Sequence, residues 1–441
     1  MGEARQAVVL IHGIGEQRPM STLRGFVATV LSFFADQLGG KPAFYSKPDA
    51  YDETFELRRI IAQQPKRTDF YELYWAHLMP DAHWNRIASW FWLMMLRAPK
   101  NVPLRILPIW LLSWAAMFAA AVVILPQLVS WLAGVVDPVA SRPSVPWIAG
   151  ALVAALSAIV LSYVGDAAIY FGSSPRNIEA RRRIRALGLN LLRQLNADPR
   201  YDRIIVVGHS LGSVVGYDVI NLCWHRLLDE WRNGYLARVN AGQAPLNGTK
   251  QVMAAEAMAK GNPDDFDLAR WEAQTDAVRA EIAANGYDWK IAHFISLGSP
   301  LTHADLLMAA NRREFSERKE QREFATAPPY LENKGFTYYH RFRTANGKTK
   351  SIRVPHHAAA FSAMRWTNIY FGRPFRWGTD LVGGQVSNLF GQGVRDICVH
   401  SNIWMGLLSH IHYWRLPRGR QYNSAPQVLM EALKLDRGTA E

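Results

Sequence analysis

The sequence predicts an α/β fold, in which a mostly parallel sheet carries helices on both faces and is interrupted by a two-helix transmembrane hairpin. Three observations lead to this fold class. Short apolar runs, typical of buried parallel strands, alternate with amphipathic stretches. Two much longer runs, residues 106–136 and 143–165, contain no charged residue. One short apolar run ends at a serine between two glycines, and an amphipathic stretch follows it.

Length and composition limit the class of protein. With 441 residues, 49% of them hydrophobic, the chain can form one large domain or two ordinary ones. A net charge of +13 favours an acidic partner, and an anionic lipid bilayer fits better than nucleic acid because the sequence has no basic-aromatic module or recognition helix. Cys223 and Cys398 have neither zinc-site nor disulfide-framework spacing, and the first residues lack a signal-peptide pattern.

The expected elements come in two groups separated by the long apolar runs. Residues 1–80 form the first part of the α/β domain, 81–175 the membrane insertion, and 176–441 the second part. Residues 227–290 are a possible helical lid, with Asn262 as an N-cap and Gly286 as a stop. Strands are expected at QAVVLIHG, TFELRRIIA, TDFYELYW, YDRIIVVGHS, WKIAHFISLGSP and RWTNIYF, and helices at 22–38 and 177–195.

The insertion has the length of a membrane hairpin. A helix of roughly 20 apolar residues crosses a bilayer core, and both charge-free runs are at least that long. The segment before them, with three tryptophans between 84 and 92, is expected to lie along the bilayer, with a core helix as the alternative. Basic residues flank the outer ends of the runs, so the positive-inside rule predicts that both chain ends face the cytoplasm. We therefore expect an integral membrane protein, of the bacterial inner membrane, with its catalytic domain on the cytoplasmic side. Two buried core helices are the alternative.

The sequence Gly208-His209-Ser210-Leu211-Gly212 is a complete G-x-S-x-G motif. A strand-like run precedes it and an amphipathic stretch follows, which is the context of a nucleophile elbow. In that turn the serine hydroxyl stands above the sheet, and the glycines let the backbone approach closely. We therefore expect Ser210 to be a nucleophile, with an ordinary glycine-rich turn as the alternative.

The stretch LIHGIGEQ ends the first expected strand with His-Gly. In hydrolases with a nucleophile elbow, such a strand end places a backbone N–H beside the nucleophile. We expect the N–H of Gly13 or Ile14, together with that of Leu211, to form an oxyanion hole. His12 itself is expected to have a structural role.

At these motifs the chain resembles the lipase/esterase group of the serine α/β-hydrolases. The matching stretches are VVLIHGIGEQ, VVGHSLGS, FISLGSPL and a late SHIHYW, and the likeness covers most of the chain outside the hairpin. The resemblance implies an α/β-hydrolase fold and hydrolysis of acyl lipids or related esters, with no cofactor and no metal.

The resemblance also implies a histidine near the C-terminal end, in a pattern like H-x-x-Y-W. His410 fits this pattern with Tyr413, and His412 is the second choice. The other late histidines are His356, His357 and His400. The chosen histidine would accept the Ser210 proton and then protonate the leaving alcohol.

The acid of the triad should follow the strand RWTNIYF. Relatives often have an aspartate soon after Asn-x-Tyr, but Phe371 and Gly372 stand there. Asp380, in TDLVGG, resembles the family's aspartate before an apolar residue and glycine, and Asp305 and Asp396 are the alternatives.

Together these expectations describe a membrane-anchored serine hydrolase that cleaves carboxylic esters of lipids or lipid-like molecules through an acyl-enzyme. Its partners would be the lipid bilayer and the ester substrate. Two alternatives stay open: a non-catalytic membrane scaffold that keeps the fold, and an exported antibacterial lipase effector.

Overall fold

A computed structural model of the chain describes most of the α/β domain. The described residues are 5–13, 18–38, 44–51, 56–63, 66–79, 95–99, 102, scattered positions between 107 and 122, 170–172, 174–240, 249–332, 335–343, 347–372, 380, 382–399, 409–414 and 424–435.

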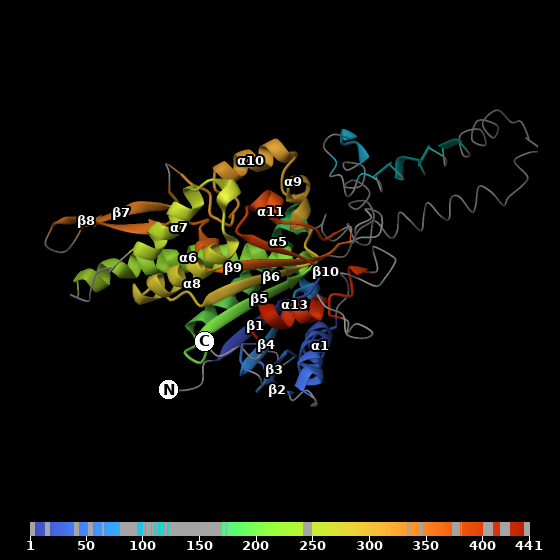
Figure 1. The fold of residues 1–441 in the computed structure, drawn as a ribbon, viewed down its shortest axis with the longest axis horizontal. Helices are drawn as coiled ribbons and strands as arrows, with labels where there is room; N and C mark the ends of the chain where they lie inside the picture. The colour runs from blue at the N-terminus through green and yellow to red at the C-terminus, as the bar shows by residue number, and fades with distance from the viewer. Residues whose placement is uncertain are drawn as a thin grey trace, which may run out of the picture.

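An eight-stranded, mostly parallel sheet forms the centre of the domain (Figure 1). Neighbouring strands are parallel from β10 through to β4, and the last two pairings, β4 with β3 and β3 with β2, are antiparallel. Strands from before and after the insertion share this sheet, because β1 lies between β4 and β5. In spatial order the strands are β10 (Val394–Val399), β9 (Arg365–Phe371), β6 (Ile291–Leu297), β5 (Arg203–His209), β1 (Gln6–Ile11), β4 (Thr68–Leu73), β3 (Arg58–Ala62) and β2 (Phe44–Pro48).

Helices cover both faces of the sheet, as Figure 1 shows. Helices α1 (Ser21–Leu38) and α13 (Ala425–Ala432) pack together on one face, and α5 (Pro175–Ala197) and α6 (Leu211–Asn240) pack together on the other. Alternate side chains of each strand enter the two cores: Val8 and Leu10 face the α1 side, while Val9 and Ile11 face the α6 side. Both faces of β1, β5 and β6 are buried, which explains their largely apolar sequences.

Further elements surround this framework. The strands β7 (Thr337–Arg343) and β8 (Thr349–Pro355) form a separate antiparallel pair. The buried Glu256 of α7 holds this pair, because it accepts hydrogen bonds from the N–H groups of Phe336 and Thr337 and pairs with Arg353 at 2.6 Å. The helices not yet given are α7 (Lys250–Lys260), α8 (Leu268–Ala284), α9 (Ala304–Leu307), α10 (Arg312–Glu320), α11 (Ser387–Phe390) and the 3₁₀ turns η1 (Ala76–Leu78), η3 (Pro263–Asp265), η4 (Pro300–His303) and η5 (Ala360–Ser362).

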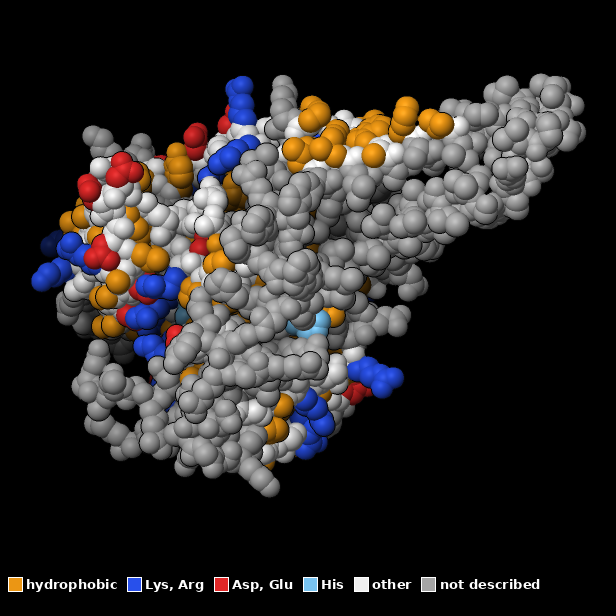
Figure 2. Space-filling view, turned by 45° about the vertical axis from the view of Figure 1, so that its right-hand side comes forward, with side chains coloured by type: hydrophobic (Ala, Val, Ile, Leu, Met, Phe, Trp, Pro, Cys, Tyr) orange, Lys and Arg blue, Asp and Glu red, His pale blue; other side chains and the backbone are white. Residues whose placement is uncertain are grey.

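The predicted transmembrane hairpin is wrong for this fold. Within the described residues, no helix is both long and apolar enough to span a bilayer. Helical positions of the first run are described between 107 and 122. Leu111, Phe118 and Val122 are exposed in this segment. Figure 2 shows a group of exposed apolar side chains, in orange, at the top of the view. Residues 123–169, with all of the second run, and the expected interfacial residues 81–94 lie outside the described residues.

The segment 227–290, a possible lid by sequence, contributes α7, α8 and the end of α6. Trp271 of α8 is buried in the core on the α6 side of the sheet. Glu272 pairs with Arg395 at 2.6 Å, and Asp276 pairs with Arg365. Arg365 and Arg395 lie where β9 and β10 begin, at the edge we call the amino edge. Helix α8 is therefore packed against the amino edge, away from the carboxyl edge where β5 ends in the serine turn.

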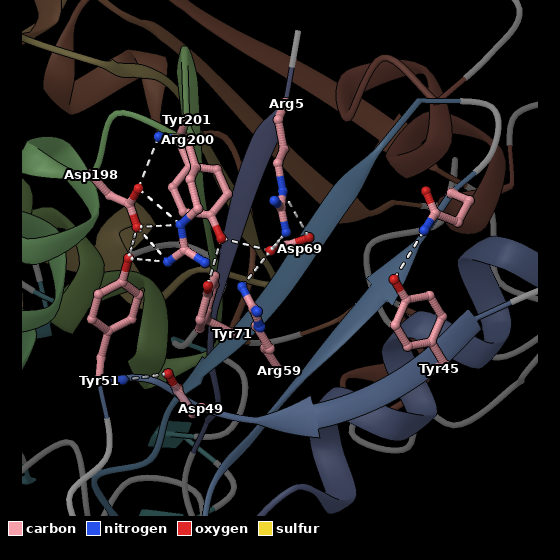
Figure 3. A network of polar contacts seen from close by, with 11 residues as sticks. Arg5, Tyr45, Asp49, Tyr51, Arg59, Asp69, Tyr71, Asp198, Arg200 and Tyr201 are labelled. Carbon is pink, nitrogen blue, oxygen red and sulfur yellow. Dashed lines mark hydrogen bonds and ion pairs between the residues drawn. The ribbon is translucent and has the colours of Figure 1, made fainter. Parts of the chain in front are cut away.

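A buried ionic network also lies at the amino edge (Figure 3). Asp69, near the start of β4, is fully buried and pairs with Arg5 at 2.5 Å and with Arg59 at 3.0 Å. The hydroxyl of Tyr201 donates to the same carboxylate at 2.6 Å and lies 2.6 Å from the hydroxyl of Tyr71. Two guanidinium groups and a phenol thus join β1, β3 and β4 to the chain that enters β5.

Candidate active site

Ser210 stands on a sharp turn between β5 and α6. Its φ of 52° lies in the left-handed region, which a non-glycine residue seldom adopts. A Cβ on Gly208 would lie 2.5 Å from the Cα of Ser213, and one on Gly212 would lie 2.2 Å from the carbonyl oxygen of Ile11. Only glycine fits at either position, so the motif supplies the close backbone approach that the turn requires.

The end of β1 lies directly beside this serine. A Cβ on Gly13 would be 2.9 Å from the Cβ of Ser210, so the Gly13 backbone is in contact with the serine. Leu211 follows Ser210 as the first residue of α6, where backbone N–H groups have no partner within the helix and carry its positive dipole end. Of the three predicted oxyanion-hole residues, Gly13 and Leu211 flank Ser210, and Ile14 lies outside the described residues.

A continuous chain of hydrogen bonds joins Ser210, His410 and Asp380. Nε2 of His410 lies 2.8 Å from Oγ of Ser210, and Nδ1 lies 2.9 Å from Oδ2 and 3.1 Å from Oδ1 of Asp380. All three side chains are buried. Residues separated by up to 200 positions in sequence therefore meet at the carboxyl edge.

The carboxylate of Asp380 has more donors than the imidazole alone. Tyr413 donates its hydroxyl to Oδ2 at 2.7 Å, and the N–H of Val382 donates to Oδ1 at 2.9 Å. Burial would raise the pKa of Asp380, but the charge and hydrogen bond of His410, with the bonds from Tyr413 and the Gly383 N–H, outweigh it and lower the pKa to about 2. The Asp380 carboxyl group is therefore ionised at pH values well above 2.

Two further histidines support the site in their neutral form. Nε2–H of His209 donates to the carbonyl oxygen of His410 at 2.9 Å, and burial, followed by the nearness of His410, lowers the pKa of His209 to about 3. Burial likewise lowers the pKa of His12 to about 4, and its ring stacks on Trp75, whose backbone N–H donates to Nε2 at 3.2 Å. His12 thus holds the end of β1 against the end of β4.

The alternative acids lie in other surroundings. Asp396 accepts hydrogen bonds from the side chain of Asn368 and from the N–H groups of Val386 and Ser387, so it holds a turn. Asp305 lies in the first turn of α9, and burial raises its pKa.

The alternative histidines are also accounted for within the described residues. The N–H of His412 donates to the carbonyl oxygen of Ser409, in the turn that carries His410. His356 and His357 form hydrogen bonds to the carbonyl oxygens of Tyr330 and Arg322, and His400 lies outside the described residues.

Two contacts at the site were not expected from sequence. The hydroxyl of Tyr413 bridges Asp380 and the N–H of Phe371, which joins the acid to the end of β9. Oγ of Ser213 donates to the carbonyl oxygen of Ser210 at 2.6 Å and lies 2.6 Å from Oγ of Ser299. The signal for Tyr413 was present in the SHIHYW motif, where the tyrosine served only to identify the histidine.

The described residues contain no group of three or more histidine, cysteine, aspartate or glutamate side chains arranged to hold a metal ion. No protein-family model, curated protein or solved structure matches the chain.

Proposed function

We propose that the protein is a serine hydrolase that cleaves carboxylic esters through an acyl-enzyme. The observation that carries the proposal is the hydrogen-bonded chain from Ser210 through His410 to Asp380, with the serine on a strained turn at the start of a helix. Nucleophile, base and orienting acid are the three parts that activation of a serine requires.

In the first half of the reaction, Oγ of Ser210 attacks the acyl carbon of the ester while Nε2 of His410 takes the hydroxyl proton. The carbonyl oxygen becomes an oxyanion, and the N–H groups of Leu211 and of Gly13 or Ile14 stabilise it. The C–O bond to the alcohol then breaks, and His410 gives its proton to the departing oxygen.

In the second half, water attacks the acyl carbon and gives a proton to His410. The bond to Ser210 breaks, the acid product leaves, and the serine regains its proton from His410. Asp380 keeps Nδ1 of His410 as the protonated nitrogen, so that Nε2 can accept a proton, and it stabilises the imidazolium that forms in each half.

The substrates we propose are esters of lipids or lipid-like molecules, on the basis of the motif resemblance. The membrane location expected from sequence rested on the hairpin and forms no part of the proposal. Hydrolysis of p-nitrophenyl esters of increasing acyl length tests the substrate class, because a lipid esterase should prefer the longer chains.

A fluorophosphonate probe tests the reaction type, because it reacts covalently with an activated serine. We expect the full chain to be labelled, and labelling to be lost in Ser210→Ala and strongly slowed in His410→Gln. His412→Gln is the matched control, two positions away in the same turn, and should be labelled at the wild-type rate. Absence of labelling in the wild type, or equal labelling of Ser210→Ala, would contradict the proposal.

A further inference from the structure

A groove of about 600 Å³ lies on the outer side of the helices that bear the nucleophile. Its walls come from α5 and α6, from the chain around α9 and α10, and from residues near His357. Its described lining includes none of Ser210, His410 and Asp380. The lining residues of α6 lie between 217 and 225, so the groove extends roughly 10 to 22 Å from the serine along the axis of that helix.

Positive charge exceeds negative charge in this groove. Four arginines line it against two carboxylates, those of Asp218 and Glu323, and the two lining histidines are counted as neutral. The excess of positive charge favours an anionic ligand. We call the four arginines the arginine set: Arg181, Arg185, Arg318 and Arg322.

The two arginines of α5 stand one helical turn apart and are held in place by their neighbours. Arg185 donates to Oδ2 of Asp218 through Nε at 3.1 Å and Nη2 at 2.7 Å, and the hydroxyl of Tyr170 donates to the same oxygen. Arg181 donates through Nη1 to the carbonyl oxygens of Tyr170 and Gly172. Within the part of the chain that the structure describes, both Arg181 bonds leave from Nη1, so Nε and Nη2 remain donors for a ligand.

The other two arginines are held on the opposite segment. The guanidinium carbon of Arg318 lies 4.6 Å from the ring centroid of Phe324, and its Nε donates to Glu323 at 2.6 Å. Arg322 pairs with Glu332 through Nη1, and its buried Nε has no partner among the described residues. These contacts hold the guanidinium groups in place before a ligand binds, so the arginine side chains lose less conformational entropy on binding.

The same groove also has apolar walls. Phe171, Leu222, Leu307 and Met308 line it beside the arginines. Its volume lies within the range of small-molecule sites and exceeds what a single phosphate group fills. The site therefore suits an anion that carries an organic body.

We propose that the arginine-lined groove between α5, α6 and α10 binds an organic phosphate monoester. A guanidinium group binds two phosphate oxygens at once through parallel N–H donors, and Arg181 and Arg322 keep such donors for a phosphate within the described residues. The phosphate lies among the arginine set, and the organic body lies against the apolar wall. The site is separate from the proposed hydrolase centre and does not depend on hydrolysis.

Calorimetric titration of the full chain carrying Ser210→Ala tests the site without any turnover. The probes are inorganic phosphate, glycerol 3-phosphate, and vesicles of phosphatidylcholine with and without phosphatidic acid. We expect saturable binding of glycerol 3-phosphate, tighter than that of inorganic phosphate because of the apolar wall. Binding to the phosphatidic acid vesicles beyond that to glycerol 3-phosphate identifies a lipid headgroup as the source, and equal or weaker binding identifies a free metabolite.

Matched arginine variants locate the binding. Arg181→Gln and Arg318→Gln should each weaken glycerol 3-phosphate binding about tenfold, since each removes charge-assisted bonds. Arg182→Gln and Arg313→Gln make the same charge change on the same two helices, but these arginines are well exposed and do not line the groove, so binding should be unchanged.

A variant that is expected to tighten binding distinguishes the proposal from a general effect of misfolding. Glu323→Gln removes a carboxylate that competes for Arg318, so it should tighten glycerol 3-phosphate binding by about threefold. A thermal unfolding curve is recorded for every variant to check that it is folded. The proposal is overturned if no phosphate probe binds saturably, if the exposed-arginine controls lose as much affinity as the groove variants, or if Glu323→Gln fails to tighten binding.

Discussion

The two edges of the central sheet each bury one aspartate, but with different partners. At the amino edge, Asp69 pairs with the guanidinium groups of Arg5 and Arg59 and accepts a bond from Tyr201, as Figure 3 shows. At the carboxyl edge, Asp380 accepts bonds from an imidazole, a phenol and backbone N–H groups. Both carboxylates are fully buried and fully hydrogen-bonded within the described residues, so burial alone does not distinguish them.

The difference lies in what the partner can do. A guanidinium group keeps its charge at any ordinary pH, so the ion pairs of Asp69 have a single state and serve the fold. An imidazole can accept a proton and release it again in the course of a reaction, so the partner of Asp380 can serve as a base and then as an acid. Ionised Asp380 stabilises the charged state of His410, which is the state that the proposed reaction passes through.

The largest expected effect is the loss of activity in Asp380→Asn. An amide in place of the carboxylate favours the wrong tautomer of His410 and cannot stabilise its charge, so kcat should fall roughly 10⁴-fold. Steady-state kinetics on a p-nitrophenyl ester measures this. Asp396→Asn is the control at the alternative acid and should cause no comparable loss; a larger loss there would reverse the assignment.

Asp69→Asn should act on stability instead. It leaves two largely buried guanidinium groups without their carboxylate, which should lower the free energy of unfolding by roughly 3–5 kcal/mol. Urea unfolding measures the loss, and kcat of the folded fraction should stay near wild type. Glu179→Gln breaks an exposed pairing on α5 and should leave the urea midpoint nearly unchanged. A loss of kcat in Asp69→Asn without a loss of stability would contradict the assignment of Asp69 to the fold rather than to the proposed reaction.

Acid should destabilise the carboxyl edge through His209. Its pKa is about 3 in the folded chain against an ordinary 6.5, so between these values the unfolded chain takes up a proton that the folded chain does not. Stability therefore falls as the pH falls below 6.5. At pH 5 the contribution is about 2 kcal/mol, so the stability advantage of wild type over His209→Gln should shrink by about that amount from pH 7 to pH 5. An advantage that is constant or grows toward pH 5 contradicts this.

The smallest expected effect is that of Tyr413→Phe, which removes one donor from Asp380 and leaves His410 in contact with it. We expect kcat to fall about tenfold, the value of one hydrogen bond to a charged group. Tyr339→Phe changes an exposed tyrosine in the same way and should leave kcat unchanged. A rise in KM alone, with kcat unchanged, would show that Tyr413 does not act through Asp380.

The sequence predicted the centre of the sheet better than its borders. The strand before the serine and RWTNIYF lie where expected because both faces of these strands are buried, which gives the first a continuous apolar run and the second several apolar and aromatic residues. Strand β2 (Phe44–Pro48) is exposed throughout, and β10 (Val394–Val399) is a half-buried edge strand with Arg395 and Asp396 within it, so neither has that pattern. The transmembrane hairpin predicted from the long apolar runs was wrong, because no helix of the described residues is long and apolar enough to cross a bilayer.

At the site, the sequence motif predicted the part that depends on neighbouring residues, which is the serine turn. The turn at Ser210 depends on adjacent glycines and could be read from five residues. The partnership of His410 and Asp380 depends on where distant loops meet, so the sequence offered candidates and the resemblance chose among them. Asn262 shows the same limit on a small scale: it caps the 3₁₀ turn η3 (Pro263–Asp265), while Asp267 caps the helix α8 itself.

The late position of His410 has a consequence for how the protein is made. Helix α13 packs on α1, and the side chain of Gln6, in the first strand, donates to the carbonyl oxygen of Leu433. While the chain is being synthesised, the serine turn is complete some 200 residues before its base leaves the ribosome. Under the proposed mechanism, a nascent chain should have no esterase activity until the segment that carries His410 has emerged from the ribosome.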